Sequence, residues 1–181
     1  MTPTTAIRAL IFVLAGAFAL VAAPLSGSAG AAGPNVGFGF NARDVAGFPS
    51  GVVFLTGGGS FDPVSGVVHS GGGFRCVTTV NQGPLTGCEA GQGVRWDPAS
   101  MLRSTTFKCT GAATETLKPI STDDQTAVIA ADFYRAGDGN DESFNANMIV
   151  SAHDIAPDIA GVQNVWVQGV GCATAITNFS A

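Results

Sequence analysis

The sequence predicts a single-domain, all-β protein: an antiparallel β-barrel or β-sandwich meander of about 8–10 strands with two disulfides. Three observations lead to this fold class. Apolar and polar residues alternate in many short segments after residue 31, helix signals are scarce there, and four cysteines are spread through the same part of the chain. Short alternating segments bounded by Gly, Pro, Asn and Asp are typical of sandwiches and barrels.

Residues 1–31 have the features of a signal peptide. Arg8 supplies a positive charge, residues 9–23 form an apolar run, and the sequence Ala29-Gly30-Ala31 fits the small-residue cleavage pattern. The apolar run is shorter than the roughly 20 residues of a transmembrane helix. We therefore expect a secreted, extracytoplasmic protein whose mature domain, residues 32–181, has no transmembrane segment.

The expected mature domain is acidic. Without Arg8 it holds 7 of the 8 Lys and Arg residues against 13 Asp and Glu residues, which gives a formal charge of −6. Nucleic-acid-binding domains carry clustered Lys and Arg, and the sequence has no such cluster. Nucleic acids and anionic membranes are therefore disfavoured as partners, and an extracellular ligand or protein is expected instead.

The predicted strands are of two kinds. Apolar and polar residues alternate in the first kind, so that one face can cover a core; these segments are 36–41, 106–110 and 143–151. Segments of the second kind are apolar on both faces, as in strands that are buried on both sides; these are 51–56, 126–134 and 162–176. Residues 98–102, which follow Asp97 as an N-cap, indicate one helical turn, and Trp96 and Trp166 are expected in the core.

Two glycine triplets, 57–59 and 71–73, flank the sequence Asp62-Pro63-Val64-Ser65-Gly66, which suits a type I turn. If Asp62 lies opposite Val67, residues 57–59 lie opposite residues 70–72 in a hairpin. Facing glycines indicate a bend, a bulge or the close approach of another element, so at least one should have a positive φ or lie in a bulge. The alternative, a phosphate-binding loop, requires a following helix and a nearby Lys, and the sequence predicts neither.

The spacing of Gly57, Gly58, Phe61 and Gly66 resembles the glycine-rich hairpin of dirigent-like and allene-oxide-cyclase-like barrels. The similarity covers about ten residues, with the first glycines shifted by one position. The resemblance agrees with a barrel.

All four cysteines lie in the expected exported domain, and an even number in an oxidising compartment predicts two disulfides. Cys76 and Cys88 bracket a segment with turn residues, which favours a local pair and leaves Cys109 to join Cys172 in the last strand. The alternative is a zinc site made of the four cysteines, although the C-x2-C spacing typical of such sites is absent.

Four residues are candidates for acid–base catalysis in a pocket inside the barrel. His69 can titrate near neutral pH, and Arg75, Asp132 and Tyr134 would complete the polar cluster. The alternatives are structural: a solvated histidine on a strand, and an ion pair of Asp132 with Arg75, Arg95 or His69.

A polar loop after residue 135 is a candidate Ca²⁺ site. Asp138, Asn140, Asp141 and Glu142 offer the hard oxygen ligands that calcium prefers. Ser143, however, stands where an EF-hand loop would have Gly. The alternative is a loop of Asx-turns that needs no ion.

The sequence contains no complete catalytic signature. The GxSxG and HExxH motifs are absent, and disulfide-bonded cysteines cannot act as nucleophiles. A secreted binding or interaction module is therefore the expected function. The alternatives are a cyclase- or isomerase-like barrel enzyme that uses the four candidate residues, and a structural protein of the cell envelope. A polar pocket inside the barrel would favour the enzyme, and a filled interior would favour binding or structure.

Overall fold

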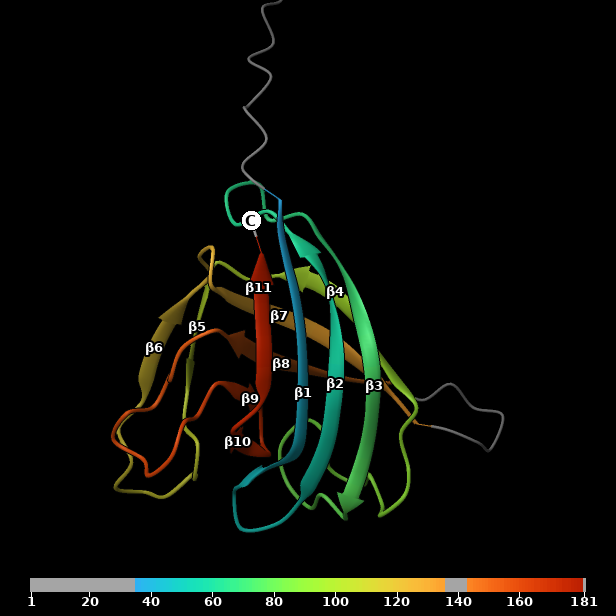
Figure 1. Ribbon diagram of the computed structural model, residues 1–181. Helices are drawn as coiled ribbons and strands as arrows, with labels where there is room; N and C mark the ends of the chain where they lie inside the picture. Colours follow the sequence, from blue (N-terminus) through green and yellow to red (C-terminus); the bar gives the residue numbers. More distant parts are fainter. Residues whose placement is uncertain (1–34, 136–142, 181) are drawn as a thin grey trace, which may run out of the picture. The chain divides into compact units, whose positions relative to one another are not determined.

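Nine strands form one antiparallel sheet that closes into a barrel (Figure 1). The computed structural model describes residues 35–135 and 143–180. The strand order is β10-β9-β8-β7-β4-β3-β2-β1-β11, and pairing of β10 with β1 closes the sheet and leaves β11 as an additional strand. The strands are β1 (Val36–Gly47), β2 (Val52–Phe61), β3 (Val68–Thr78), β4 (Arg95–Met101), β7 (Thr126–Tyr134), β8 (Ser143–Ser151), β9 (Val165–Val167), β10 (Gly171–Ala173) and β11 (Ile176–Ser180). The predicted all-β class is confirmed, as a barrel.

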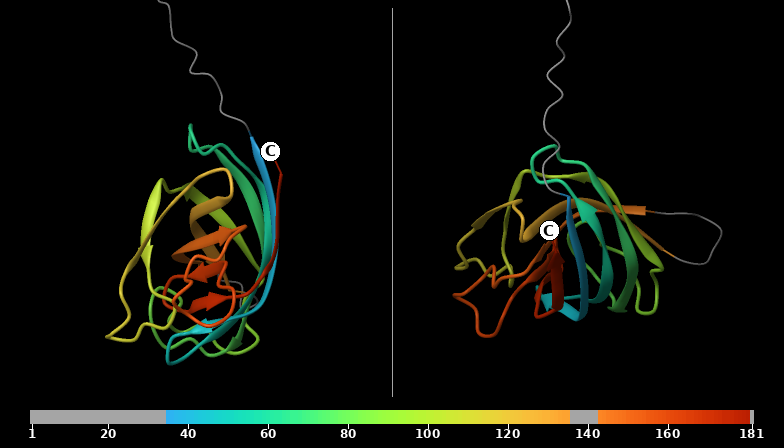
Figure 2. Two further views of the ribbon diagram at one scale, coloured as in Figure 1. Left: turned by 60° about the vertical axis from the view of Figure 1, so that its left-hand side comes forward. Right: turned by 45° about the horizontal axis from the view of Figure 1, so that its top comes forward.

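Apolar residues at alternate strand positions fill the barrel interior, because successive side chains of a strand point to opposite faces. The strands β1, β2 and β3 form a curved wall of the barrel (Figure 2), and β7 and β8 lie behind this wall in Figure 1. The core cluster contains nearly all of the large inward side chains, among them Phe38, Phe40, Leu55, Phe61, Phe74, Trp96, Ile129, Phe133 and Met148. Trp96 is fully buried and Trp166 is 4% exposed, so both tryptophans are core residues, as predicted.

The β2–β3 pair has the register that the turn sequence predicts. Asp62 N donates to Val67 O at 2.9 Å, and Gly57, Gly58 and Gly59 pair with Gly72, Gly71 and Ser70. Gly59 has a φ of 153°, which confirms that one glycine of the triplets has a conformation that other residues rarely adopt.

Trp96 explains why glycines face each other in this pair. Its indole packs against the inner side of β2 and β3, and its Nε1 donates to Thr56 O at 3.0 Å. A Cβ atom on Gly57 would lie 2.6 Å from the indole, and one on Gly72 would lie 2.7 Å from Nε1. The bare backbone therefore makes room for the largest side chain of the core.

A second antiparallel pair, β5 (Ser104–Phe107) and β6 (Lys118–Ser121), forms a separate two-stranded sheet. We call residues 104–121 the β5–β6 hairpin. A second apolar cluster joins it to the outer side of the barrel strands; its buried members are Phe107, Cys109, Val128, Ile149, Ala156, Trp166 and Cys172. Val128 and Ile149 are therefore buried although they point away from the barrel interior, which explains why β7 is apolar on both faces and why an apolar residue stands at position 149 of the alternating strand β8.

Both predicted disulfides are present. Cys76 is bonded to Cys88, and Cys109 is bonded to Cys172. No cysteine of the described residues is free, so the alternative zinc site of four thiolates is wrong. Cys172 lies in β10, however, and not in the last strand as predicted.

Two predictions of local structure are also wrong. Residues 98–102 do not form a helical turn, because β4 continues to Met101 and pairs with β7. The register shifts between Pro98 and Ser100, and such an irregularity accommodates a residue that has no N–H to donate. The segment 162–176 is not one run but contains β9 and β10, which are joined by a turn in which Gly169 has a φ of 79°. Among the described residues, no helix could cross a membrane.

Candidate functional site

The four candidate catalytic residues do not meet inside the barrel, so their predicted placement there is wrong. Phe74 and Cys76 of β3 are core residues, so His69 and Arg75, at the alternate positions, point outward and are exposed. Ala131 and Phe133 of β7 point inward, so Asp132 and Tyr134 also lie on the outer face.

The candidates are also separated along the sheet. Strand β4 lies between β3 and β7, and its Arg95 stacks on the Tyr134 ring with Cζ 4.3 Å from the centroid. Arg95 also donates from Nε to Asp97 Oδ2 at 3.1 Å. The expected ion pair of Asp132 is absent among the described residues, where its buried Oδ1 oxygen accepts no hydrogen bond. Nothing in this arrangement joins an acid, a base and a substrate pocket.

No metal site is formed by the residues that the structure describes. No group of three His, Cys, Asp or Glu side chains is close enough there to hold an ion. The predicted Ca²⁺ ligands Asp138, Asn140, Asp141 and Glu142 lie outside the described residues.

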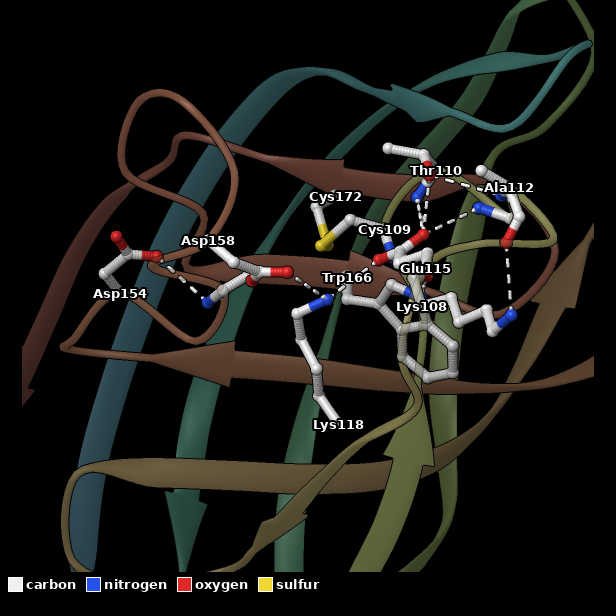
Figure 3. A network of polar contacts seen from close by, with 12 residues as sticks. Lys108, Cys109, Thr110, Ala112, Glu115, Lys118, Asp154, Asp158, Trp166 and Cys172 are labelled. Atoms are coloured by element: carbon white, nitrogen blue, oxygen red, sulfur yellow. Dashed lines mark hydrogen bonds and ion pairs between the residues drawn. A yellow bond between two sulfur atoms is a disulfide. The ribbon is translucent and has the colours of Figure 1, made fainter.

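The strongest electrostatic perturbation is at Glu115, in the loop of the β5–β6 hairpin (Figure 3). Its side chain is 6% exposed and accepts hydrogen bonds from Cys109 N at 2.7 Å, Thr110 Oγ1 at 2.6 Å and Lys118 Nζ at 3.0 Å. Burial acts to raise the pKa of Glu115, but these hydrogen bonds outweigh it and lower the pKa from 4.5 to about 2.

Lys118 completes this network. Its Nζ lies 3.0 Å from Asp158 Oδ2 as well as from Glu115 Oε1. Burial acts to lower the pKa of Lys118, and the two carboxylates reverse this and raise it. Every charge of the network is paired within the protein, so the network is a structural anchor rather than a site that awaits a ligand.

The anchor fixes the hairpin beside the barrel. Trp166 of β9 donates from Nε1 to Lys108 O at 2.8 Å, and the Cys109–Cys172 disulfide lies next to this contact (Figure 3). Sequence reasoning missed Glu115 and Lys118, because a loop with one Glu and one Lys ordinarily indicates a solvated surface.

The feature best suited to binding is a groove of about 910 Å³ on the outer face of β1, β2 and β3. We call it the outer groove. It is lined by Asn41, Arg43, Phe54, Gly73, Phe74, Arg75, Cys76, Val77, Gly91, Gly93 and Val94. Grooves of this volume can hold a small organic ligand.

Two arginines flank an aromatic side chain in the outer groove. Phe54 of β2 pairs with Arg75 of β3, and Arg43 lies in the bulge of β1 between Ala42 and Val45. Both arginines are exposed, and Phe54 is half-buried. Neither guanidinium forms an ion pair or hydrogen bond with another described residue.

Of the four candidate catalytic residues, only Arg75 lines this groove; Arg43 and Phe54 were missed. The sequence pattern of residues 51–56 predicts a strand with two buried faces, which would place Phe54 in the core. The pairing of β2 with β1 and with β3 brings Arg43 and Arg75 to the two sides of Phe54. Of these two pairings, the sequence predicts only the register of β2 with β3.

Comparisons of the chain with protein-family models, with curated proteins and with solved structures found no match.

Proposed function

We propose that the protein is a secreted, disulfide-stabilised binding module that recognises its partner in the outer groove of the barrel. One observation carries this proposal: the interior is filled by apolar side chains, whereas the groove on the outside presents two arginines that no described residue neutralises. A mostly apolar hollow with a few polar groups is typical of binding sites.

The two alternatives receive less support. An acid–base enzyme needs its titratable groups around one pocket, and His69, Asp132 and Tyr134 lie apart on the outer face. A purely structural protein needs no groove with unpaired charges. Two disulfides are compatible with an extracellular location.

The proposal can be tested with the purified, ¹⁵N-labelled protein and a library of anionic, cationic and neutral organic compounds. A binding module should show saturable shifts of the amide resonances of Gly73, Gly91 and Gly93, which line the outer groove. The amides of the β5–β6 hairpin should stay unchanged. A folded protein whose groove amides respond to no compound class would overturn the proposal.

A pair of variants sharpens this test. Phe54→Ala removes the aromatic wall of the groove and should weaken binding, whereas Leu117→Ala removes an apolar side chain that is 57% exposed on the β5–β6 hairpin and should not. Thermal unfolding of both variants checks that the fold is intact.

A further inference from the structure

We infer that the outer groove takes an amphiphilic organic anion, an inference that rests on the proposed binding function. Arg43 and Arg75 would hold the anionic head group. Phe54, Val77 and Val94 would contact the apolar body.

The strand register places the two arginines where one head group can reach both. Arg75 lies directly opposite Phe54 across the β2–β3 pair. Arg43 comes from the other neighbour of β2, between Ala42, which pairs with Leu55, and Val45, which pairs with Val53. Strands two apart in a sheet are separated by roughly 10 Å, a gap that two arginine side chains can close around one carboxylate. The guanidinium fork matches carboxylate, sulfate and phosphate oxygens.

The charge distribution favours an anion at this place. Two other basic side chains in this acidic chain are already paired with carboxylates: Arg95 pairs with Asp97, and Lys118 pairs with Glu115 and Asp158. The lining of the outer groove contains two arginines and no acidic residue. Asp44 does not line the outer groove but a neighbouring hollow of about 460 Å³, which Arg43 also lines. A cation would therefore meet repulsion in the groove, and an anion would meet two donors.

The remaining lining is suited to hydrocarbon. Val77 is 44% exposed and Val94 is 52% exposed, and both line the groove together with Phe54. Gly73, Gly91 and Gly93 add bare backbone, so a flat or extended apolar group can lie close to the sheet. Exposed apolar side chains that gather in a hollow mark a ligand surface.

Isothermal titration with matched ligands tests this inference. Decanoate, decyl sulfate and decyl phosphate carry the proposed head group, methyl decanoate removes its charge, and decyltrimethylammonium reverses it. We expect all three anions to bind, and their affinities rank the three head groups. Methyl decanoate should bind at least tenfold more weakly than decanoate, and the cation should not bind in the groove. Added salt should weaken binding of the anions.

Arginine variants assign the effect to the groove. Arg43→Gln and Arg75→Gln should each weaken decanoate binding roughly tenfold, as expected for loss of a charge-assisted hydrogen bond. Arg103→Gln is the matched control, because Arg103 lines a different hollow, beside Ser65 and Gly66. Equal weakening by all three substitutions would overturn the inference.

The outcomes separate the inference from the proposed function. If methyl decanoate or the cation binds in the groove as tightly as decanoate, the groove is a binding site and the anionic ligand class is wrong. If no member of the series or of the wider compound library shifts the groove amides, the binding function itself is wrong.

Discussion

The β2–β3 pair and the β5–β6 hairpin are both antiparallel pairs, but they are held in different ways. Facing glycines in β2–β3 leave room for Trp96, so this pair is fixed by close packing of backbone against an indole. The β5–β6 hairpin lies outside the barrel sheet and is fixed by a buried carboxylate, a lysine and a disulfide. The comparison shows that the same local structure can depend on shape in one place and on polar contacts in another.

The largest expected loss of stability comes from substitutions that disturb the packing of the β2–β3 pair. A Cβ on Gly72 would overlap Thr56 O and would lie 2.5 Å from Gly57 Cα, and backbone atoms cannot move aside without breaking the sheet. We expect Gly72→Val to lower the free energy of unfolding by about 5 kcal/mol or to prevent folding. Gly58→Val should also be strongly destabilising, since its Cβ would lie 2.5 Å from Phe38 O.

Gly39→Ala is the matched control on the adjacent strand. The nearest atom to its Cβ would be Gly57 O at 3.9 Å, so the change should stay within about 1 kcal/mol of the wild type. Urea denaturation followed by circular dichroism measures all three variants. Unfolding of Gly72→Val at the wild-type midpoint would show that Trp96 does not need the bare backbone.

The fold and the candidate site differ in how much of each can be predicted from the sequence. The all-β class, the β2–β3 register and the disulfide pairs depend on turn residues, alternation and cysteine spacing, which are local signals. The helical turn at 98–102 was wrong because the pairing of β4 with β7 overrides a local preference. The outer groove depends on strand pairing, which brings Arg43 and Phe54 to one hollow. The partners of Glu115 are near it in the sequence, but its burial depends on how the β5–β6 hairpin packs, for which the chain carries no local signal.

The second largest effect concerns the covalent link of the β5–β6 hairpin. Cys109 and Cys172 are separated by 63 residues and Cys76 and Cys88 by 12. In the chain-entropy model, closing the longer loop contributes about 4 kcal/mol and closing the shorter loop about 3 kcal/mol. Replacing Cys109 and Cys172 by Ala should therefore cost more stability than replacing Cys76 and Cys88.

Hydrogen exchange distinguishes the two double variants. Loss of the Cys109–Cys172 bond should raise exchange at the amides of the β5–β6 hairpin first, while the β2–β3 pair stays protected. Uniform loss of protection across the barrel would contradict the view that the hairpin is a separately anchored unit.

Removal of the Glu115 carboxylate should lower the free energy of unfolding by a smaller amount, which depends on pH. Since the folded-state pKa of Glu115 is about 2 and the ordinary value is 4.5, ionised Glu115 stabilises the folded protein above pH 4.5. This stabilisation is lost as the pH falls from 4.5 towards 2. Glu115→Gln should cost about 2 kcal/mol at pH 7, because an amide cannot replace the charged acceptor.

Urea denaturation between pH 7 and pH 2.5 checks this prediction. The difference in the free energy of unfolding between wild type and Glu115→Gln should shrink as the pH falls below 4.5. Glu89→Gln, at an exposed position, should leave the pH profile unchanged. A difference that does not depend on pH would assign the role of Glu115 to its shape rather than its charge.

The smallest expected effect is at the turn of the β2–β3 pair. Ser65 Oγ donates to Asp62 Oδ2 at 2.7 Å, but Ser65 is exposed and water can replace its hydroxyl, so Ser65→Ala should cost only about 0.5 kcal/mol. Asp62 is 6% exposed, and its Oδ1 accepts from Val64 N at 2.8 Å and Ser65 N at 3.2 Å. Asp62→Ala leaves these donors unpaired and should cost about 2 kcal/mol. Equal losses for the two variants in thermal unfolding would mean that the carboxylate holds the turn mainly through its bond to the Ser65 hydroxyl and not through the two backbone donors.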